Sequence, residues 1–285
     1  MNNERMAYLN GEFLPMHKAS VSPLDRGFLL GDGIYEVVPV YYKKLFRLRE
    51  HIERLNQCLK SIRMEPCLSL EDWRNLSNIL IEKNQDEHQW IYWQVTRGAD
   101  ATRGHAIPPN LSPTIFATSF PNTLPEKQAL AKGVKTIGVE DIRWKFCDIK
   151  NISRLAYVLM HQKAVDAGCG EAIIFNNGSA IECSISNLFI VKEGVIITPP
   201  KSHLLLSGIT RDCILKLAEK NKIPYRETEI SENDLLKADE VWITSSTRGV
   251  HPVVEFNGQA IGQGKAGPLW STMWDLFLAE IGQTE

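Results

Sequence analysis

Apolar residues recur at helical spacing in the first half of the chain. From Arg49 onward they fall every three or four positions, at Ile52, Leu55, Leu59 and Ile62, which predicts an amphipathic helix. Ser69-Leu70-Glu71-Asp72 resembles a capping box, in which a hydroxyl and a carboxylate satisfy the free N–H groups of a helix start. A second helix is therefore predicted from this point to about Lys83.

Shorter apolar runs bounded by turn residues predict the strands of the same half. Tyr8 to Phe13 carries Asn10-Gly11 between apolar residues, the composition of a tight hairpin whose central residues need positive φ. Further strands are predicted at residues 34–42, 90–96 and 114–119. The first half is therefore predicted to be a small α/β unit.

The second half alternates strands and helices again. Strands are predicted at residues 134–139, 171–175 and 241–244, together with a hairpin that turns at Glu193-Gly194. Helices are predicted at about residues 152–167, 210–220 and 268–281.

Between the halves, Phe120-Pro121-Asn122-Thr123-Leu124-Pro125 has two prolines and no periodic pattern, as is typical of an exposed connection. We therefore expect a small α/β domain at residues 1–119, an interdomain linker at 120–132 and a large domain at 133–285. The fold class expected is a two-domain protein of the α+β or α/β type, and the length of 285 residues also favours two domains.

Composition narrows the function classes. With 44% hydrophobic and 23% charged residues, the chain has the composition of a soluble globular protein. A formal net charge of −2 supplies no positive electrostatic field to attract a phosphate backbone, which argues against nucleic-acid binding.

The start of the chain has no apolar run of the kind a secretory signal needs, and no segment approaches the length of a membrane span. The six cysteines are scattered, without a Cys-x-x-Cys pair or a histidine cluster at ligand spacing. We therefore expect a cytoplasmic protein with reduced thiols, no metal site and no membrane partner.

Lys150, within Phe-Cys-Asp-Ile-Lys-Asn-Ile-Ser, is the first candidate for chemistry. Such a lysine often only lays its stem over apolar surface with its head in water. Alternatively, partial burial favours a neutral amine that forms a Schiff base with a carbonyl compound. The octapeptide alone does not decide between these interpretations.

Two later segments change the balance. Glu182 is followed by a run of small hydroxyl residues and an apolar strand, and Gly208-Ile209-Thr210 opens an amphipathic helix whose free N–H groups suit a phosphate. Ser, Thr and Gly also cap helices for structural reasons, so this turn is weak evidence alone. In order along the chain, however, a lysine, an acid and a phosphate-binding helix start are the parts that pyridoxal phosphate requires.

Six segments resemble the D-amino-acid aminotransferases, which belong to the fold-type IV pyridoxal-phosphate enzymes together with branched-chain aminotransferases and aminodeoxychorismate lyases. The segments are Gly31–Val37, Glu50–Leu55, Gln94–Gly98, Glu140–Trp144, Cys147–Lys150 and Gly208–Asp212. The resemblance covers nearly the whole chain in order. It implies a pyridoxal 5′-phosphate enzyme that transfers amino groups between D-amino acids, such as D-alanine, and 2-oxo acids, such as 2-oxoglutarate.

The resemblance also implies roles for individual residues. Lys150 matches the Schiff-base lysine, and Glu182 matches the carboxylate that pairs with the pyridine nitrogen. The phosphate ligands correspond to Arg54, Ile209, Thr210 and Ser246, and Leu206 matches the apolar residue beneath the cofactor ring. Tyr35, Arg103 and His105 match the residues that hold the substrate carboxylate. In the family the arginine and histidine reach into the neighbouring subunit, which implies a homodimer.

Three interpretations of function therefore compete. The first is D-amino-acid transamination. The second, from the same fold, is a branched-chain L-amino-acid or (R)-amine transaminase, or an aminodeoxychorismate lyase. The third is a non-catalytic scaffold that binds pyridoxal phosphate. Arg248, close to Ser246, and Ile185, within the serine run, depart from the family pattern and are expected to affect the substrate range rather than the reaction.

Overall fold

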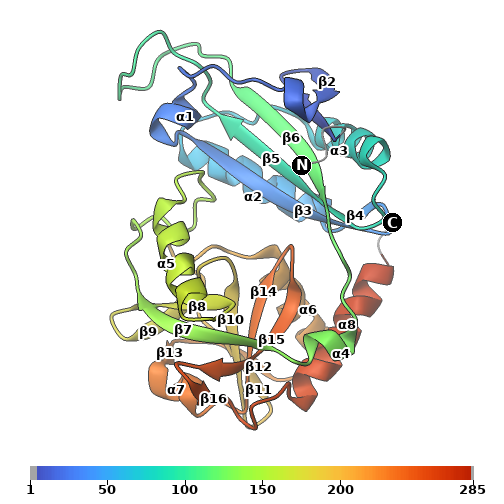
Figure 1. The fold of residues 1–285 in the computed structure, drawn as a ribbon, viewed down its shortest axis with the longest axis vertical. Helices are drawn as coiled ribbons and strands as arrows, with labels where there is room; N and C mark the ends of the chain where they lie inside the picture. The colour runs from blue at the N-terminus through green and yellow to red at the C-terminus, as the bar shows by residue number, and fades with distance from the viewer. Residues whose placement is uncertain (1–4, 284–285) are drawn as a thin grey trace. The chain divides into compact units, whose positions relative to one another are not determined.

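The computed structural model describes residues 5–283 and groups them into two compact units (Figure 1). Unit 1 contains residues 5–124 together with Ile149–Ser153, and unit 2 contains Pro125–Asp148 and Arg154–Gln283. The short segment that carries Lys150 thus belongs by its contacts to the first unit, although its chain neighbours on both sides belong to the second.

Unit 1 is built on a six-stranded sheet in the order β2-β1-β6-β5-β3-β4, with antiparallel neighbours throughout. Its strands are β1 (Met6–Leu9), β2 (Glu12–Pro15), β3 (Gly33–Tyr41), β4 (Lys44–Leu45), β5 (Gln89–Thr96) and β6 (Thr114–Pro121). Its helices are η1 (Met16–Lys18), α1 (Arg26–Leu30), α2 (Leu48–Ser61) and α3 (Leu70–Asn84). The hairpin predicted at Asn10-Gly11 is confirmed, with φ of 49° and 104° at the two turn residues.

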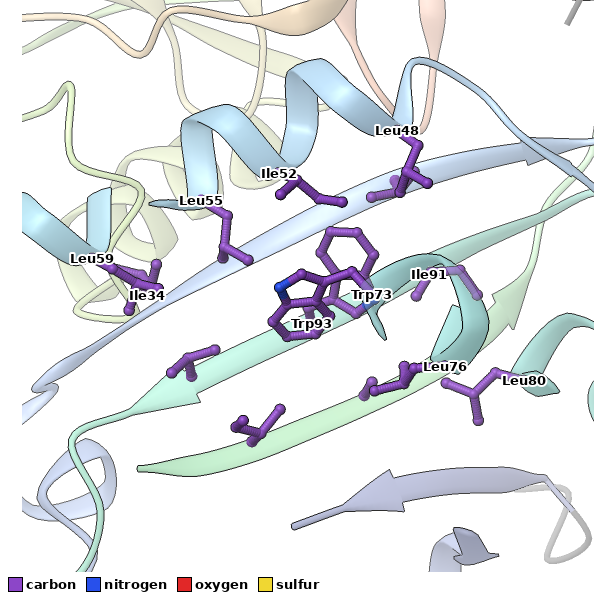
Figure 2. Close-up of a cluster of buried hydrophobic side chains, with 14 of the residues drawn as sticks. Ile34, Leu48, Ile52, Leu55, Leu59, Trp73, Leu76, Leu80, Ile91 and Trp93 are labelled. Atoms are coloured by element: carbon purple, nitrogen blue, oxygen red, sulfur yellow. The ribbon is translucent and has the colours of Figure 1, made fainter. Parts of the chain in front are cut away.

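The apolar spacing predicted from Arg49 onward forms the buried face of α2. Figure 2 shows its leucines and isoleucine directed at the sheet, with Trp73 of α3 and Trp93 of β5 at the centre of the cluster. The two indole rings are fully buried, with centroids 4.6 Å apart. The predicted capping box at Ser69 is also confirmed, since the Ser69 hydroxyl accepts from Asp72 N–H and Asp72 accepts from Ser69 N–H. This core holds β3 and α2, the elements that carry Tyr35 and Arg54.

Unit 2 contains a larger mixed sheet in the order β12-β11-β10-β14-β15-β7-β8-β9-β13, with β16 beside β15. Its strands are β7 (Val134–Glu140), β8 (Glu171–Asn176), β9 (Ser179–Cys183), β10 (Asn187–Lys192), β11 (Val195–Thr198), β12 (Tyr225–Glu227), β13 (Ile230–Ser231), β14 (Glu240–Ser245), β15 (Gly249–Phe256) and β16 (Gln259–Ala260). Its helices are α4 (Lys127–Leu130), α5 (Leu155–Asp166), α6 (Ile209–Lys220), α7 (Glu232–Leu236) and α8 (Pro268–Gly282). None of the helices in residues 5–283 is both long and apolar enough to cross a membrane.

Helix α5 begins three residues later than the periodicity predicts, because the residues before it pair with β3. Tyr35 N–H donates to the Lys150 carbonyl at 3.0 Å, and Ile152 N–H donates to the Gly33 carbonyl at 3.1 Å. A side chain at Gly33 would lie 2.7 Å from a carbonyl oxygen of β5 and 3.1 Å from Ile152. The Gly-x-Gly turn therefore allows a close approach of backbone segments rather than forming a nucleotide site.

Candidate active site

In unit 1, Lys150 is held along β3. Besides the bond from Tyr35 to its carbonyl, its own N–H donates to the Cys58 sulfur at 3.4 Å. Its side chain is half-buried, and Nζ lies 4.3 Å from the centroid of the Tyr35 ring. The structure thus brings two predicted site residues together, and the ring face offers the amine a weakly polar, cation-accepting surface.

Arg54, from α2, is fixed by Glu36 of β3. Its Nε donates to Glu36 Oε1 at 2.6 Å and its Nη2 donates to Oε2 at 2.9 Å, while His51 Nδ1 lies 2.9 Å from the same Oε2. Glu36 and His51 are at most 1% exposed. Burial opposes the charged carboxylate, but the Arg54 charge and the hydrogen bonds from His51 and Arg54 hold the Glu36 pKa well below its usual value.

Burial also lowers the pKa of His51, against the opposing effect of Glu36. The ring is therefore neutral, and it donates Nδ1–H to the carboxylate. Glu36 and His51 were not singled out from the sequence, although Glu36 lies in one matched segment and His51 in another. The available signal was their placement near Arg54: His51 lies three residues before it on α2, and Glu36 lies on the neighbouring strand β3.

Arg103 and His105 lie in the connection between β5 and β6, and both are exposed. Neither side chain makes a hydrogen bond or an ion pair with another residue in the part of the chain that the structure describes. Tyr35 lies apart from that loop in sequence, on β3, where its ring stacks on Tyr92 with centroids 5.7 Å apart. The structure thus leaves the Arg103 guanidinium available to an external anion.

In unit 2, Glu182 at the end of β9 is 4% exposed and faces an arginine. Arg143 Nη1 donates to Glu182 Oε1 in a short hydrogen bond. Glu182 Oε2 accepts from Leu206 N–H at 3.1 Å, which brings these two predicted site residues together. Burial raises the pKa of Glu182 to about 7, and Arg143 and Leu206 oppose that rise only in part.

Arg143 was missed by sequence reasoning, although it lies in the matched segment Glu140–Trp144. Its guanidinium is shared. Nε and Nη2 donate to the two oxygens of Asp141 at 2.8 Å each, and Nη2 also donates to the Leu204 carbonyl at 2.9 Å. The pKa of Arg143 is raised, against burial, by Asp141 and Glu182, so it stays a cation beside Glu182.

Ile209 and Thr210 form the first turn of α6, as predicted, and both are buried. The N-cap residue is Gly208, and no side chain caps the free N–H groups of this twelve-residue helix. A Cβ on Gly208 would clash with Asn187 Oδ1, while Asn187 Nδ2 donates to the Leu206 carbonyl at 2.9 Å. The start of α6 is thus held close to β10 and presents uncapped donors to an anion.

Ser246 lies in the turn between β14 and β15, half-buried. Two residues on, Arg248 is drawn toward a buried carboxylate, because its Nη1 donates to Glu171 Oε2 at 3.3 Å. Burial opposes the charge of Glu171, but hydrogen bonds from His161 and the Ser184 hydroxyl, with the Arg248 charge, keep its pKa low. Ile185, beside Ser184, is 44% exposed. Arg248 thus has a partner within the fold.

The donor set fits pyridoxal phosphate. In unit 2, the uncapped N–H groups at the start of α6 and the hydroxyls of Thr210 and Ser246 are donors of the kind that bind a phosphate. In unit 1, Arg54 is a fixed guanidinium, which also suits a phosphate. A ring nitrogen needs a buried carboxylate, which Glu182 supplies. In residues 5–283, no group of three or more His, Cys, Asp or Glu side chains is arranged to hold a metal ion.

The sequence of this chain is similar to those of known aminotransferases. Residues 33–256 match the family model described as amino-transferase class IV. The chain is 40% identical to a D-alanine aminotransferase of Bacillus licheniformis, over 91% of each protein. It is 41% identical to a D-alanine aminotransferase of Staphylococcus aureus strain N315, over 95% of each.

Among solved structures, a branched-chain amino acid aminotransferase of Escherichia coli superposes with a TM-score of 0.90 at 28% identity, covering 99% of this chain and 96% of that one. A T.th. branched-chain amino acid aminotransferase with pyridoxamine 5′-phosphate also gives a TM-score of 0.90, at 27% identity over 98% and 94% of the two chains. These matches confirm the expected fold type. This chain belongs to the class IV aminotransferases.

Proposed function

We propose that this aminotransferase moves amino groups between D-amino acids, such as D-alanine, and 2-oxo acids, such as 2-oxoglutarate. The observation that carries the proposal is the match to D-alanine aminotransferases at 36–41% identity over most of both chains. The branched-chain enzymes match the fold at lower identity, 24–28%. They favour L-branched-chain transamination as the second candidate.

Both units contribute residues to this function. The cofactor, when bound, supplies an electron sink for the pair left behind when the substrate Cα–H bond breaks. Lys150 attaches the cofactor and its freed amine carries the proton between substrate Cα and the acceptor carbon. Arg54, Ser246, Thr210 and the first N–H groups of α6 bind the phosphate.

Glu182 keeps the ring nitrogen protonated, because a carboxylate beside that nitrogen stabilises its N–H. Arg143 supports this role by remaining a cation that favours the charged form of Glu182. Leu206 supports the ring from beneath. Its N–H fixes one Glu182 oxygen, so the apolar support and the acid are held by a single backbone bond.

Recognition of the substrate carboxylate falls to Tyr35, Arg103 and His105. A planar guanidinium matches a carboxylate bidentately, and fixing that group decides which enantiomer directs its Cα–H at Lys150. Arg103→Ala should therefore raise KM for D-alanine by about ten- to a hundredfold, the loss of a charge-assisted hydrogen bond of about 1.5–3 kcal/mol. The absorbance of the bound cofactor should not change. An unaltered KM would remove Arg103 from this role.

The enzyme is proposed to be a homodimer in the cytoplasm. Supporting observations are exposed apolar side chains on α5, at Leu155, Val158 and Leu159, and on unit 1, at Val21, Leu24 and Phe28. A pocket of about 570 Å³ in unit 1 is lined by apolar side chains, among them Phe28, Phe116 and Ile152, and by polar ones such as Asp25 and Thr96. Exposed apolar surface of this kind is typical of subunit interfaces. All six cysteines are free, as expected in a reducing compartment.

The activity test is a panel of D- and L-amino donors with several 2-oxo acids, run on wild type and on Lys150→Ala. We expect turnover with D-alanine and near-complete loss in the variant. Borohydride reduction followed by peptide mapping should label Lys150 and not the nearby, exposed Lys145. A label on Lys145 would contradict the assignment, and a preference for L-leucine would favour the branched-chain candidate. The dimer is tested by comparing the sedimentation coefficient of Leu159→Glu, which places a charge on the exposed apolar face of α5, with that of wild type.

A further inference from the structure

A buried ion cluster in unit 1 joins segments that lie far apart in the sequence. Asp32 accepts from Arg26 Nε at 2.8 Å and from Nε and Nη2 of Arg97 at 2.8 and 2.9 Å. Arg97 also donates to the carbonyls of Ile62 and Arg63, just beyond α2. Arg26 is only 3% exposed. Its guanidinium is therefore desolvated, paired and fixed in direction.

The same guanidinium reaches the loop that carries Arg103 and His105. Arg26 Nη1 donates to the carbonyl oxygen of Gly104, the residue between those two, at 2.7 Å. The structure assigns no helix or strand to residues 97–113, so no ladder of backbone bonds fixes this part of the loop. A charge-assisted bond from a buried arginine supplies a fixed point instead.

The base of the loop is anchored separately, by backbone. Arg26 N–H donates to the Gly98 carbonyl at 2.9 Å, and Asp100 N–H donates to the Leu24 carbonyl at 3.3 Å. Gly98 has φ of +99°, and a Cβ there would clash with the Ser112 carbonyl oxygen. Loss of the Arg26 side chain would leave these contacts intact and release only the stretch around Gly104.

We propose that Arg26 is a positioning residue for substrate recognition. By holding the Gly104 carbonyl, it fixes the backbone from which Arg103 and His105 bind the substrate α-carboxylate. The inference rests on the proposed role of those two residues. The physical gain is pre-organisation, because a loop that is already ordered loses less conformational entropy when the substrate binds. Arg26 acts through the loop, since its own charge is committed to Asp32.

The first test compares Arg26→Ala, Arg26→Lys and wild type, with Arg74→Ala as a control on an exposed arginine of α3. Asp32 keeps Arg97 as its partner in each variant. We expect KM for D-alanine to rise about tenfold in Arg26→Ala, the size of a lost charge-assisted hydrogen bond, with kcat nearly unchanged. Arg26→Lys should raise KM less than Arg26→Ala does, because the ammonium keeps the positive charge. It should still raise KM above wild type, because an ammonium lacks the fork that reaches both Asp32 and Gly104. A fall in kcat at constant KM would overturn the proposal.

The second test separates positioning from general stability. In an Arg103→Ala background, Arg26→Ala should raise KM much less than it does in wild type, since its effect passes through Arg103 and His105. An equal, additive rise would refute that route.

A third measurement does not depend on activity. Amide hydrogen exchange at residues 101–106 should be faster in Arg26→Ala and unchanged in Arg74→Ala, while α2 keeps its protection. Unchanged exchange at residues 101–106 would overturn the proposal even in an active enzyme. A wild type that prefers L-leucine would instead refute the proposed D-specificity, and faster exchange would still support the loop contact.

Discussion

Two buried carboxylates, Glu36 in unit 1 and Glu182 in unit 2, each pair with an arginine, yet their pKa values move in opposite directions. Glu36 accepts two bonds from Arg54 and one from His51, and its pKa is lowered. Glu182 accepts one bond from Arg143, whose guanidinium also binds Asp141 twice, and its other bonds come from the neutral donors Leu206 N–H and Asn187 Nδ2. Burial therefore raises its pKa to about 7.

The difference shows that an ion pair alone does not determine the role of a buried acid. Glu36 is saturated with donors, so it serves as a fixed support for Arg54. The arginine beside Glu182 divides its charge between two acids, so Glu182 retains the capacity to favour a second positive partner. A protonated ring nitrogen is such a partner.

Replacing Glu36 should have the largest effect on the stability of the protein. Glu36→Gln leaves Arg54 buried without its carboxylate, and removing one member of a buried pair costs about 3–5 kcal/mol of unfolding free energy. Urea denaturation of the purified variant measures this loss. The control is Glu50→Gln, which removes a partly exposed partner of Arg47 and should cost at most about 1 kcal/mol. Equal losses in the two variants would mean that Glu36 is not a special support.

Glu182→Gln tests the other acid through catalysis. We expect kcat to fall about 10²-fold or more, because the side chain that keeps the ring nitrogen protonated loses its charge. The stability loss should be smaller than in Glu36→Gln, since Arg143 keeps Asp141 as a partner. Steady-state kinetics with D-alanine gives the answer. An unchanged kcat would mean that Glu182 is not the carboxylate with this role.

The two acids should also contribute opposite slopes to the dependence of stability on pH. The folded pKa of Glu36 lies below the ordinary value of 4.5, so its stabilisation is present above that pH and is lost as pH falls. The folded pKa of Glu182 lies above 4.5, so its contribution declines as pH rises from about 4.5 to 7. Urea midpoints of the cofactor-free protein from pH 3 to 8 should show each slope flattened by the matching Gln variant. A slope of the same sign at both sites would contradict the contrast.

Much of this architecture follows from local sequence. The capping box at Ser69, the Asn10-Gly11 turn and the spacing of the α2 leucines are short-range signals, and the structure confirms them. The start of α5 was predicted too early, because Ile152 bonds to β3 and no local pattern encodes that pairing.

The supporting residues escaped prediction for a related reason. Glu36, His51 and Arg143 look like ordinary polar residues in the sequence, and only tertiary packing reveals that each is buried against another charge. The order of Lys150, Glu182 and the start of α6 suggested a cofactor site from the sequence, whereas the roles of the other site residues came from the family resemblance. Their roles in this chain are predictions, which the variants described above test.

The placement of Ile149–Ser153 within unit 1 has a consequence for how the protein is made. A ribosome releases the chain from its amino terminus, and domains generally fold as they emerge. Here Ile34 pairs with Asn151, so the edge of β3 cannot be completed until the chain has been translated past the first segment of unit 2, Pro125–Asp148. The amine at Lys150 thus reaches its place over Tyr35 only after residues 5–124 of unit 1 have been synthesised. A fragment ending at residue 124 would lack this segment altogether.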